Sequence, residues 1–161
     1  MRKVISKQTL PMSALKLRVD IISDFVCPWC YIGKRRLFAA LKANPQIEAK
    51  GWFHYLLLIS HTVVWSPFFL TAPGSVPESG VSITEYLAKK YGGGSIEKAT
   101  QMQQQLQKVG TQEGIQFNDG RSMYPTLKIH RLTTWAQDLD SPEVNVPTLV
   151  DDLLKSYFEE A

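Results

Sequence analysis

The chain has 161 residues, of which 44% are hydrophobic and 20% are charged, as in an ordinary soluble domain whose core needs no disulfide framework. Its formal net charge of +3 is too small to favour nucleic acid as a partner. No apolar run of signal-peptide length opens the sequence, so residues 1–16 are expected to be a disordered leader of a cytoplasmic protein. A mitochondrial presequence is the alternative, because this segment carries basic and hydroxyl side chains and no acid.

The first predicted elements are a strand, a helix and a further apolar stretch. Residues 17–22, LRVDII, are rich in β-branched side chains and predict a strand. Pro28 stands where a helix can begin, because a proline lacks the N–H group that the first helical turn leaves unpaired. That helix is expected to end before Pro45, and residues 52–65 supply one or two more strands. This strand–helix–strand order implies parallel strands.

The apolar stretch over residues 52–70 has about the length of a membrane span. His54, His61 and Pro67 interrupt it, and polar side chains are costly in hydrocarbon. We therefore expect buried strand and no stable membrane insertion, with a membrane helix as the alternative.

After residue 70 the pattern becomes helical. Three prolines and two glycines mark residues 66–80 as loop. Four helices then follow from the spacing of apolar side chains and from caps, within residues 82–94, 95–110, 125–139 and 146–161, the last with Pro147 near its start. The predicted division is therefore a leader at 1–16, the N-terminal part of an α/β domain at 17–70 and a helical domain at 71–161.

The chain has two cysteines, Cys27 and Cys30, separated by Pro28 and Trp29. A thiol reacts as its thiolate, and Cys27 lies between a strand end and a helix start, where unpaired N–H groups and the helix dipole stabilise an anion. Cys30 lies one helical turn further on, so it can resolve a mixed disulfide formed on Cys27. The pattern therefore predicts dithiol–disulfide exchange that needs neither a metal nor an organic cofactor.

Two other interpretations of the cysteine pair remain open. A zinc site needs two more ligands, and the spacing from Cys30 to His54 and His61 lies outside the usual finger patterns. An inert buried pair is the second alternative. Neither accounts for a Cys-Pro-Trp-Cys sequence at a helix start as well as a redox pair does.

The segment SDFVCPWCYIGKRRL, residues 23–37, resembles the active-site segment of the DsbA-like thioredoxin-fold oxidoreductases, specifically the FrnE-type branch. The resemblance covers about residues 17–161 and continues through residues 65–70, 80–92, 114–117, 130–136 and 157–160. It implies an α/β fold, a thioredoxin-like βαβ unit with a helical insertion domain. It also implies exchange by Cys27 and Cys30 with polypeptide thiols or disulfides or with a small thiol, glutathione being a possible redox partner.

Relatives of the same fold leave a second activity open. The 2-hydroxychromene-2-carboxylate isomerases and kappa-class glutathione transferases use glutathione and typically carry a serine where this chain has Cys27. A glutathione-dependent isomerase or transferase is therefore the first alternative, and a redox-silent binding paralogue is the second.

Several other residues are candidates for modulating the site or binding substrate. Trp29 replaces the histidine that DsbA proper carries, and an indole cannot stabilise the thiolate as an imidazolium would, so we expect a weaker oxidant. Asp24 could influence proton transfer at Cys30, although an ordinary turn residue is expected more often. His130 is expected to be a packed, hydrogen-bonded histidine rather than a base.

Phe68 and Phe69 could form an apolar docking surface for an unfolded polypeptide, and core packing is the default expectation for them.

Three departures from the family pattern carry expectations of their own. The family closes its thioredoxin half after the helical block with two strands and a cis-proline, and we expect these C-terminal strands to be missing here, with Pro147 as a helix-start proline. An incomplete sheet predicts marginal stability, or a dimer or partner that covers it. Residues 52–62 look like an insertion of about a dozen residues, and Tyr124-Pro125 stands near the family's usual Asn-Thr pair.

Overall fold

The computed structural model of the chain describes residues 16–44, 60–139, 141 and 143–160. The predicted leader lies almost wholly outside the described residues, as does the part of the apolar stretch before Ser60. The expectation of an insertion at 52–62 therefore falls largely outside them too.

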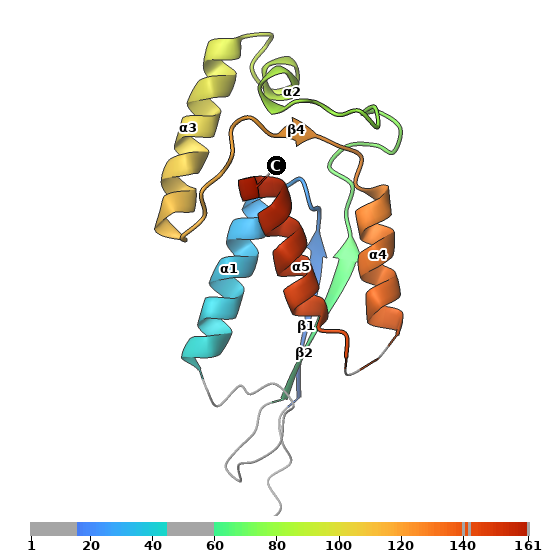
Figure 1. Ribbon diagram of the computed structural model, residues 1–161. Coiled ribbons are helices and arrows are strands. Elements are labelled where there is room, and N and C mark those ends of the chain that lie inside the picture. Colours follow the sequence, from blue (N-terminus) through green and yellow to red (C-terminus); the bar gives the residue numbers. More distant parts are fainter. Residues whose placement is uncertain (1–15, 45–59, 140, 142, 161) are drawn as a thin grey trace, which may run out of the picture.

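A parallel strand–helix–strand unit forms the base of the fold, as the sequence pattern predicts. Strand β1 (Lys16–Ser23) runs into helix α1 (Pro28–Ala43), and strand β2 (Ser60–Pro67) pairs with β1 in parallel. The register runs from Lys16 opposite Ser60 to Ser23 opposite Pro67, so both strands end at the same edge (Figure 1). The loops that follow them therefore meet at that edge.

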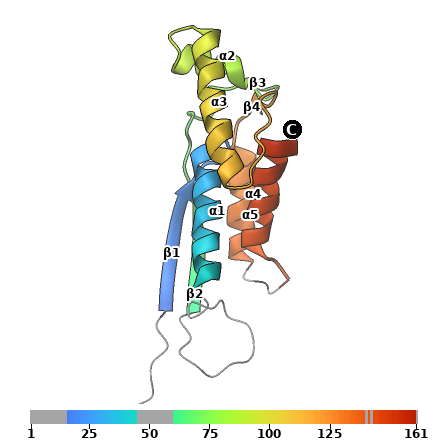
Figure 2. The same ribbon diagram turned by 90° about the vertical axis from the view of Figure 1, so that its left-hand side faces the viewer.

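The two strands turn their apolar side chains toward one side. Successive side chains of a strand alternate between faces, and Ile21, Val63 and the buried Trp65 pack into the main core. Ile22 points the other way and is 71% exposed. Figure 2 shows α1 and two later helices on one side of β1.

The helical block contains the four helices expected from the sequence. These are α2 (Ile83–Lys90), α3 (Ile96–Gln112), α4 (Leu127–Asp138) and α5 (Val146–Lys155), and a π-helical turn, Ser156–Glu160, continues α5. Two short strands, β3 (Val81–Ser82) and β4 (Ser122–Met123), pair antiparallel and were not predicted. Helices α4 and α5 lie on the same side of the β1–β2 pair (Figure 2), whereas α2, α3 and β4 lie at the end of the molecule where α1 begins (Figure 1). No helix among the described residues has the length and apolar character needed to cross a membrane.

Helix α5 begins as a proline at the first turn predicts. Pro147 occupies the start of the helix, and the Asn145 side chain caps it by accepting a hydrogen bond from the Thr148 N–H at 3.0 Å. The described residues contain no cis peptide bond. The expectation of a helix-start proline at position 147 is confirmed.

Tyr124, one of the two residues that differ from the family's usual Asn-Thr pair, packs closely against Gly80. Gly80 adopts a φ of +77°, and a Cβ there would lie 2.5 Å from the Tyr124 ring. Only glycine satisfies both the left-handed backbone and this close approach.

One hydrophobic core joins the βαβ unit to the helical block. Its buried members come from both sides of the predicted boundary at residue 70 and are Phe25, Tyr31, Ile32, Trp65, Leu106, Ile115, Phe117, Val150, Leu154 and Phe158. The boundary itself stays a prediction, but the packing that stabilises the two parts is shared.

Polar contacts also connect α1 to α5 and to the π-helical turn that continues it. The fully buried Tyr31 donates its hydroxyl to Glu159 Oε1 at 2.6 Å, and Lys34 Nζ lies 2.5 Å from Asp151 Oδ1. Burial and the hydrogen bond to Glu159 together raise the pKa of Tyr31 to about 12. These contacts hold the first turns of α1, and hence Cys30, in place.

Candidate active site

The turn between β1 and α1 positions both thiols. Asp24 O accepts a hydrogen bond from the Cys27 N–H at 3.2 Å, and Cys27 has the extended backbone of a residue that precedes a helix. Pro28 is the first residue of α1, as predicted. Cys27 O accepts hydrogen bonds from the N–H groups of Cys30 at 3.0 Å and Tyr31 at 3.4 Å, so Cys30 lies one turn inside the helix.

The two thiols are free, half-buried and joined by a hydrogen bond. The pKa of Cys30 is lowered to about 6, chiefly because its thiolate accepts a hydrogen bond from Cys27, with Ser23 and the Asp24 backbone adding to the effect against the cost of burial. The pKa of Cys27 is raised, because its proton is held in that same hydrogen bond and its sulfur is partly buried. The pair thus forms its first thiolate readily and its second with difficulty.

The sequence put the lowered pKa on Cys27, and this stays a prediction, because a hydrogen bond shared by two thiols does not decide which of them carries the charge. The expected effect of the helix start is present, since the N–H groups of Trp29 and Cys30 do lower the pKa of Cys27. The hydrogen bond to Cys30 outweighs it. The position of Cys27 at the helix start does not by itself predict a hydrogen bond between its thiol and that of Cys30.

Cys27 lines a cavity. A hollow of about 470 Å³ opens beside the start of α1, and Val26, Cys27, Pro28 and Trp29 form one of its walls. Trp29 is 60% exposed, in agreement with a tryptophan at the rim of a groove. A substrate bound in this cavity therefore lies beside Cys27.

Asp24 and His130 form a buried pair behind the cysteine turn. Asp24 is fully buried; its Oδ2 accepts the Leu70 N–H at 2.6 Å, and its Oδ1 lies 3.2 Å from His130 Nε2. The same Nε2 lies 3.1 Å from the carbonyl oxygen of Phe68. Because a carbonyl oxygen only accepts, Nε2 carries the hydrogen and donates to both oxygens. Burial alone would raise the pKa of Asp24, but the hydrogen bonds from His130 and Leu70 outweigh it and lower the pKa.

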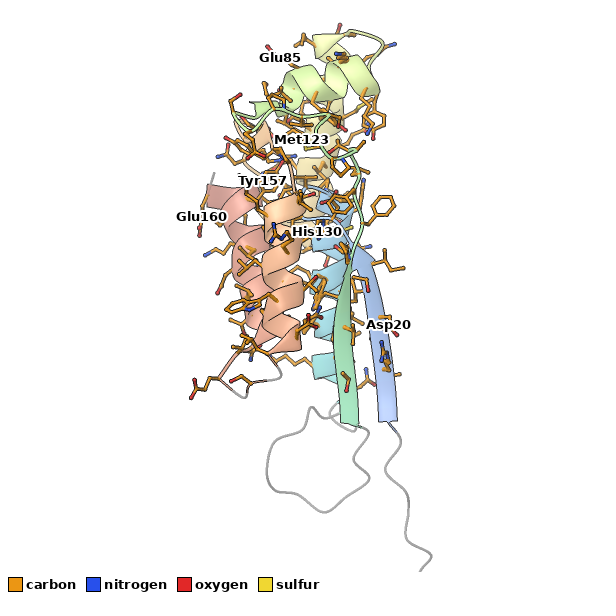
Figure 3. The ribbon with its side chains drawn as sticks, turned by 90° about the vertical axis from the view of Figure 1, so that its right-hand side faces the viewer. Asp20, Glu85, Met123, His130, Tyr157 and Glu160 are labelled. Atoms are coloured by element: carbon orange, nitrogen blue, oxygen red, sulfur yellow. The ribbon has the colours of Figure 1, made fainter. Side chains whose placement is uncertain are left out.

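The surroundings of His130 match the expectation of a packed histidine. Its ring lies edge-on to Phe25 and Phe69, with centroids 5.3 and 4.9 Å away, and it is 5% exposed. Figure 3 shows His130 on α4, near the upper ends of β1 and β2. Asp24 is likewise more than a turn residue, because its carboxylate joins three segments.

Phe68 and Phe69 have different surroundings. Phe69 is half-buried against His130, whereas Phe68 is 52% exposed. Neither belongs to the wall of the cavity at Cys27. Their role as a docking surface stays a prediction.

The rest of the cavity wall was not found from the sequence. It comes from α2, α3 and β4 and includes Tyr86, Met102, Gln103, Arg121 and Met123. These positions look like ordinary helix and loop positions, and no local motif marks them. Within the described part of the chain, no three histidine, cysteine or acidic side chains gather in a way that could hold a metal ion, and His54 lies outside it.

Comparisons with known proteins agree with this geometry. Residues 18–160 match the family model described as the DSBA-like thioredoxin domain. The chain belongs to this family. Its fold is accordingly α/β and thioredoxin-like, with a helical insertion.

Among solved structures, this DSBA-like chain is similar to a probable DsbA oxidoreductase from Streptomyces coelicolor. The two are 30% identical with a TM-score of 0.68, and the match covers 88% of this chain and 54% of that one. The chain thus spans about half the length of that structure. No curated protein matches it. The FrnE-type branch stays a prediction.

Proposed function

We propose that the chain is a thiol–disulfide oxidoreductase that exchanges its Cys27–Cys30 dithiol with disulfides of polypeptide substrates. The observation that carries the proposal is the pair of free, half-buried thiols at the start of α1, beside an open cavity that Cys27 lines. The hydrogen bond between the two thiols lowers the pKa of Cys30 to about 6, so the pair can form a thiolate near neutral pH. Family membership supports an oxidoreductase in general.

The reaction conserves atoms and electrons. The proton of Cys27 first moves to Cys30, which makes Cys27 the thiolate. This thiolate attacks one sulfur of the substrate disulfide. The substrate S–S bond breaks, and the other substrate sulfur leaves as a thiolate that takes a proton from water. Cys30 then gives its proton to water and attacks the Cys27 sulfur; the S–S bond between Cys27 and the substrate breaks, and the substrate sulfur leaves as a thiolate that takes up a proton. The second substrate thiol is released, the Cys27–Cys30 disulfide forms, and two electrons have passed to the substrate. The reverse sequence oxidises a dithiol.

An insulin-reduction assay tests the proposal, with wild type, Cys27→Ser and Cys30→Ser compared under dithiothreitol and, separately, under glutathione. We expect Cys27→Ser to lose activity and Cys30→Ser to accumulate a mixed disulfide with insulin that mass spectrometry detects.

Two outcomes would contradict the proposal. Glutathione-dependent turnover that survives in Cys27→Ser would favour the isomerase or transferase alternative. A folded wild-type chain without activity in either arm would favour redox-silent binding.

A further inference from the structure

The cavity beside Cys27 is mostly apolar. Helix α2 contributes Tyr86 and Leu87, α3 contributes Met102, Leu106 and Val109, and β4 contributes Met123. A volume of about 470 Å³ is within the range of small-ligand sites, roughly 300–1,000 Å³. The cavity can therefore take an apolar arm of a substrate whose sulfur reaches Cys27.

One cation interrupts this apolar wall. Arg121 lines the cavity and is only 3% exposed. Its Nη1 donates to Asn118 O at 2.8 Å, and its guanidinium lies over the rings of Phe117 and Phe158, 5.8 and 5.4 Å from their centroids. No carboxylate of the described residues lies within ion-pair distance of it.

The contacts of Arg121 leave part of it unsatisfied. Its Nε is buried and has no hydrogen-bond partner among the described residues. Gln103, which lines the same cavity and is 4% exposed, donates its amide to Thr84 Oγ1 at 2.9 Å and leaves its own Oε1 without a partner. Buried charges are normally paired and buried polar atoms hydrogen-bonded, because leaving them unpaired is costly.

The burial of Arg121 without any ligand could be explained by its packing over the rings of Phe117 and Phe158. Cation–π contacts stabilise the charge, yet they satisfy neither Nε nor the Gln103 oxygen. A ligand with a carboxylate and an apolar body complements the charge and the apolar wall together.

We propose that this cavity is a subsite for disulfides whose sulfur-bearing arm is apolar and ends in a carboxylate, which Arg121 binds while the sulfur meets Cys27. This inference rests on the proposed dithiol–disulfide exchange and adds the chemical class of the substrate. Arg121 is then a residue that determines specificity, and no part in the electron transfer itself is assigned to it.

Two aromatic disulfides separate recognition from reactivity. Dithiobis(nitrobenzoate) carries a carboxylate on each ring, whereas dithiodipyridine carries none. With either probe, the Cys27 thiolate attacks and releases one aromatic thiol, and Cys30 releases the second and closes the Cys27–Cys30 disulfide. Both reactions release a coloured thiol, so the rate of each is read from absorbance.

The ratio of the two rates is the test. We expect Arg121→Met to slow the reaction with dithiobis(nitrobenzoate) about tenfold or more, the effect of losing a charge-assisted hydrogen bond, and to leave the dithiodipyridine rate within about twofold. The matched control is Arg131→Met, an exposed arginine on α4, which should leave both rates unchanged. An altered thiolate pKa would move both probes together and leave their ratio constant.

A second measurement uses the wild-type chain and does not depend on how Arg121→Met folds. We expect phenylpropionate to protect Cys27 from iodoacetamide, with the site of alkylation identified by mass spectrometry, and phenylpropionamide to protect far less. Disulfide-linked dimers of acetyl-Cys-Phe, with a free carboxylate or an amide at the C-terminus, then show which kind of molecule supplies the carboxylate. The rate at which the chain reacts with the acid is compared with the rate for the amide. A gain for the peptide acid indicates a polypeptide C-terminus, and a gain confined to the aromatic acid indicates a small organic disulfide.

Equal protection by acid and amide, or equal sensitivity of both probes to Arg121→Met, would overturn carboxylate recognition and leave the proposed exchange intact. Failure of the folded wild type to react with either disulfide would remove the proposed function and this inference together.

Discussion

At the scale of single residues, the hydrogen bond between Cys27 and Cys30 makes the pair acidic. Cys27 lines the cavity, and the hydrogen bond from Cys27 lowers the pKa of Cys30 to about 6. The hydrogen bond between them lets the proton move from one sulfur to the other without leaving the site. A substrate can therefore meet a reactive sulfur at neutral pH although the pKa of that sulfur in the resting pair is raised.

Replacing Cys27 by alanine is expected to raise the pKa of Cys30 from about 6 toward the ordinary value of a cysteine, about 8.5. The reason is that the lost Cys27 thiol is the main donor to the Cys30 thiolate. Ultraviolet absorbance of the thiolate, followed as a function of pH, measures this shift. In the control Cys30→Ala, the pKa of Cys27 should fall, because its proton is no longer held by a neighbouring thiolate. A wild-type chain without any thiolate below pH 8 would contradict this account.

At the scale of elements, Asp24 and His130 join three segments around the cysteine turn. Asp24 directly follows β1, Leu70 and Phe68 belong to the loop after β2, and His130 comes from α4. The parallel register brings the two strand ends together, and the buried carboxylate then satisfies donors from the neighbouring loop and helix. The turn that carries Cys27 is thereby held against the helical block.

Asp24→Asn is expected to reduce the free energy of unfolding by roughly 1–3 kcal/mol, the cost of an unsatisfied buried donor. An asparagine turns one carboxylate oxygen into an NH₂ group, which must face either the Leu70 N–H or the His130 Nε2–H. Urea denaturation measures the change. Asp20→Asn is the matched control, because Asp20 is exposed and its ion-pair partner among the described residues is the equally exposed Arg18. Equal stability of the two variants would show that the buried network is not needed.

At the scale of the whole molecule, the main core crosses the boundary between the predicted domains. Tyr31 and Trp65 from the βαβ unit pack in the same cluster as Leu154 and Phe158 from the last helical segment. Phe158 stacks on Tyr31 with ring centroids 5.6 Å apart. The smaller cluster of Val26, Val76 and Met123 also crosses this boundary, so the two parts are expected to unfold together.

Native-state hydrogen exchange tests this cooperativity. We expect the slowest amides of β2 and α5 to exchange with the same free energy of opening, and Leu154→Ala to lower both by the same amount, about 2–5 kcal/mol. Leu154 is suited to this test because it is 1% exposed and belongs to the shared cluster. If the β1–α1–β2 amides kept their protection while α5 exchanged, the boundary at residue 70 would separate independent units.

Much of the fold could be predicted because its signals are local. The proline at position 28, the β-branched run before it and the amphipathic stripe of Val150, Leu154 and Phe158 each determine their own element. The short β3–β4 pair could not be found in this way, since two-residue strands carry no periodicity. His130 was expected to be packed, but its partner Asp24 lies 106 positions away in sequence.

The sequence by itself determined where the thiols stand and what they can do, because a Cys-Pro-Trp-Cys turn between a strand and a helix is a local arrangement with its own chemistry. Only the tertiary structure decided that the two thiols are hydrogen-bonded to each other and that Cys27 lines a cavity. It also decided that Arg121 and Gln103 lie beside Cys27, and that Asp24 is held by a histidine from α4. These properties depend on burial and on contacts between segments far apart in sequence, and no local pattern encodes them.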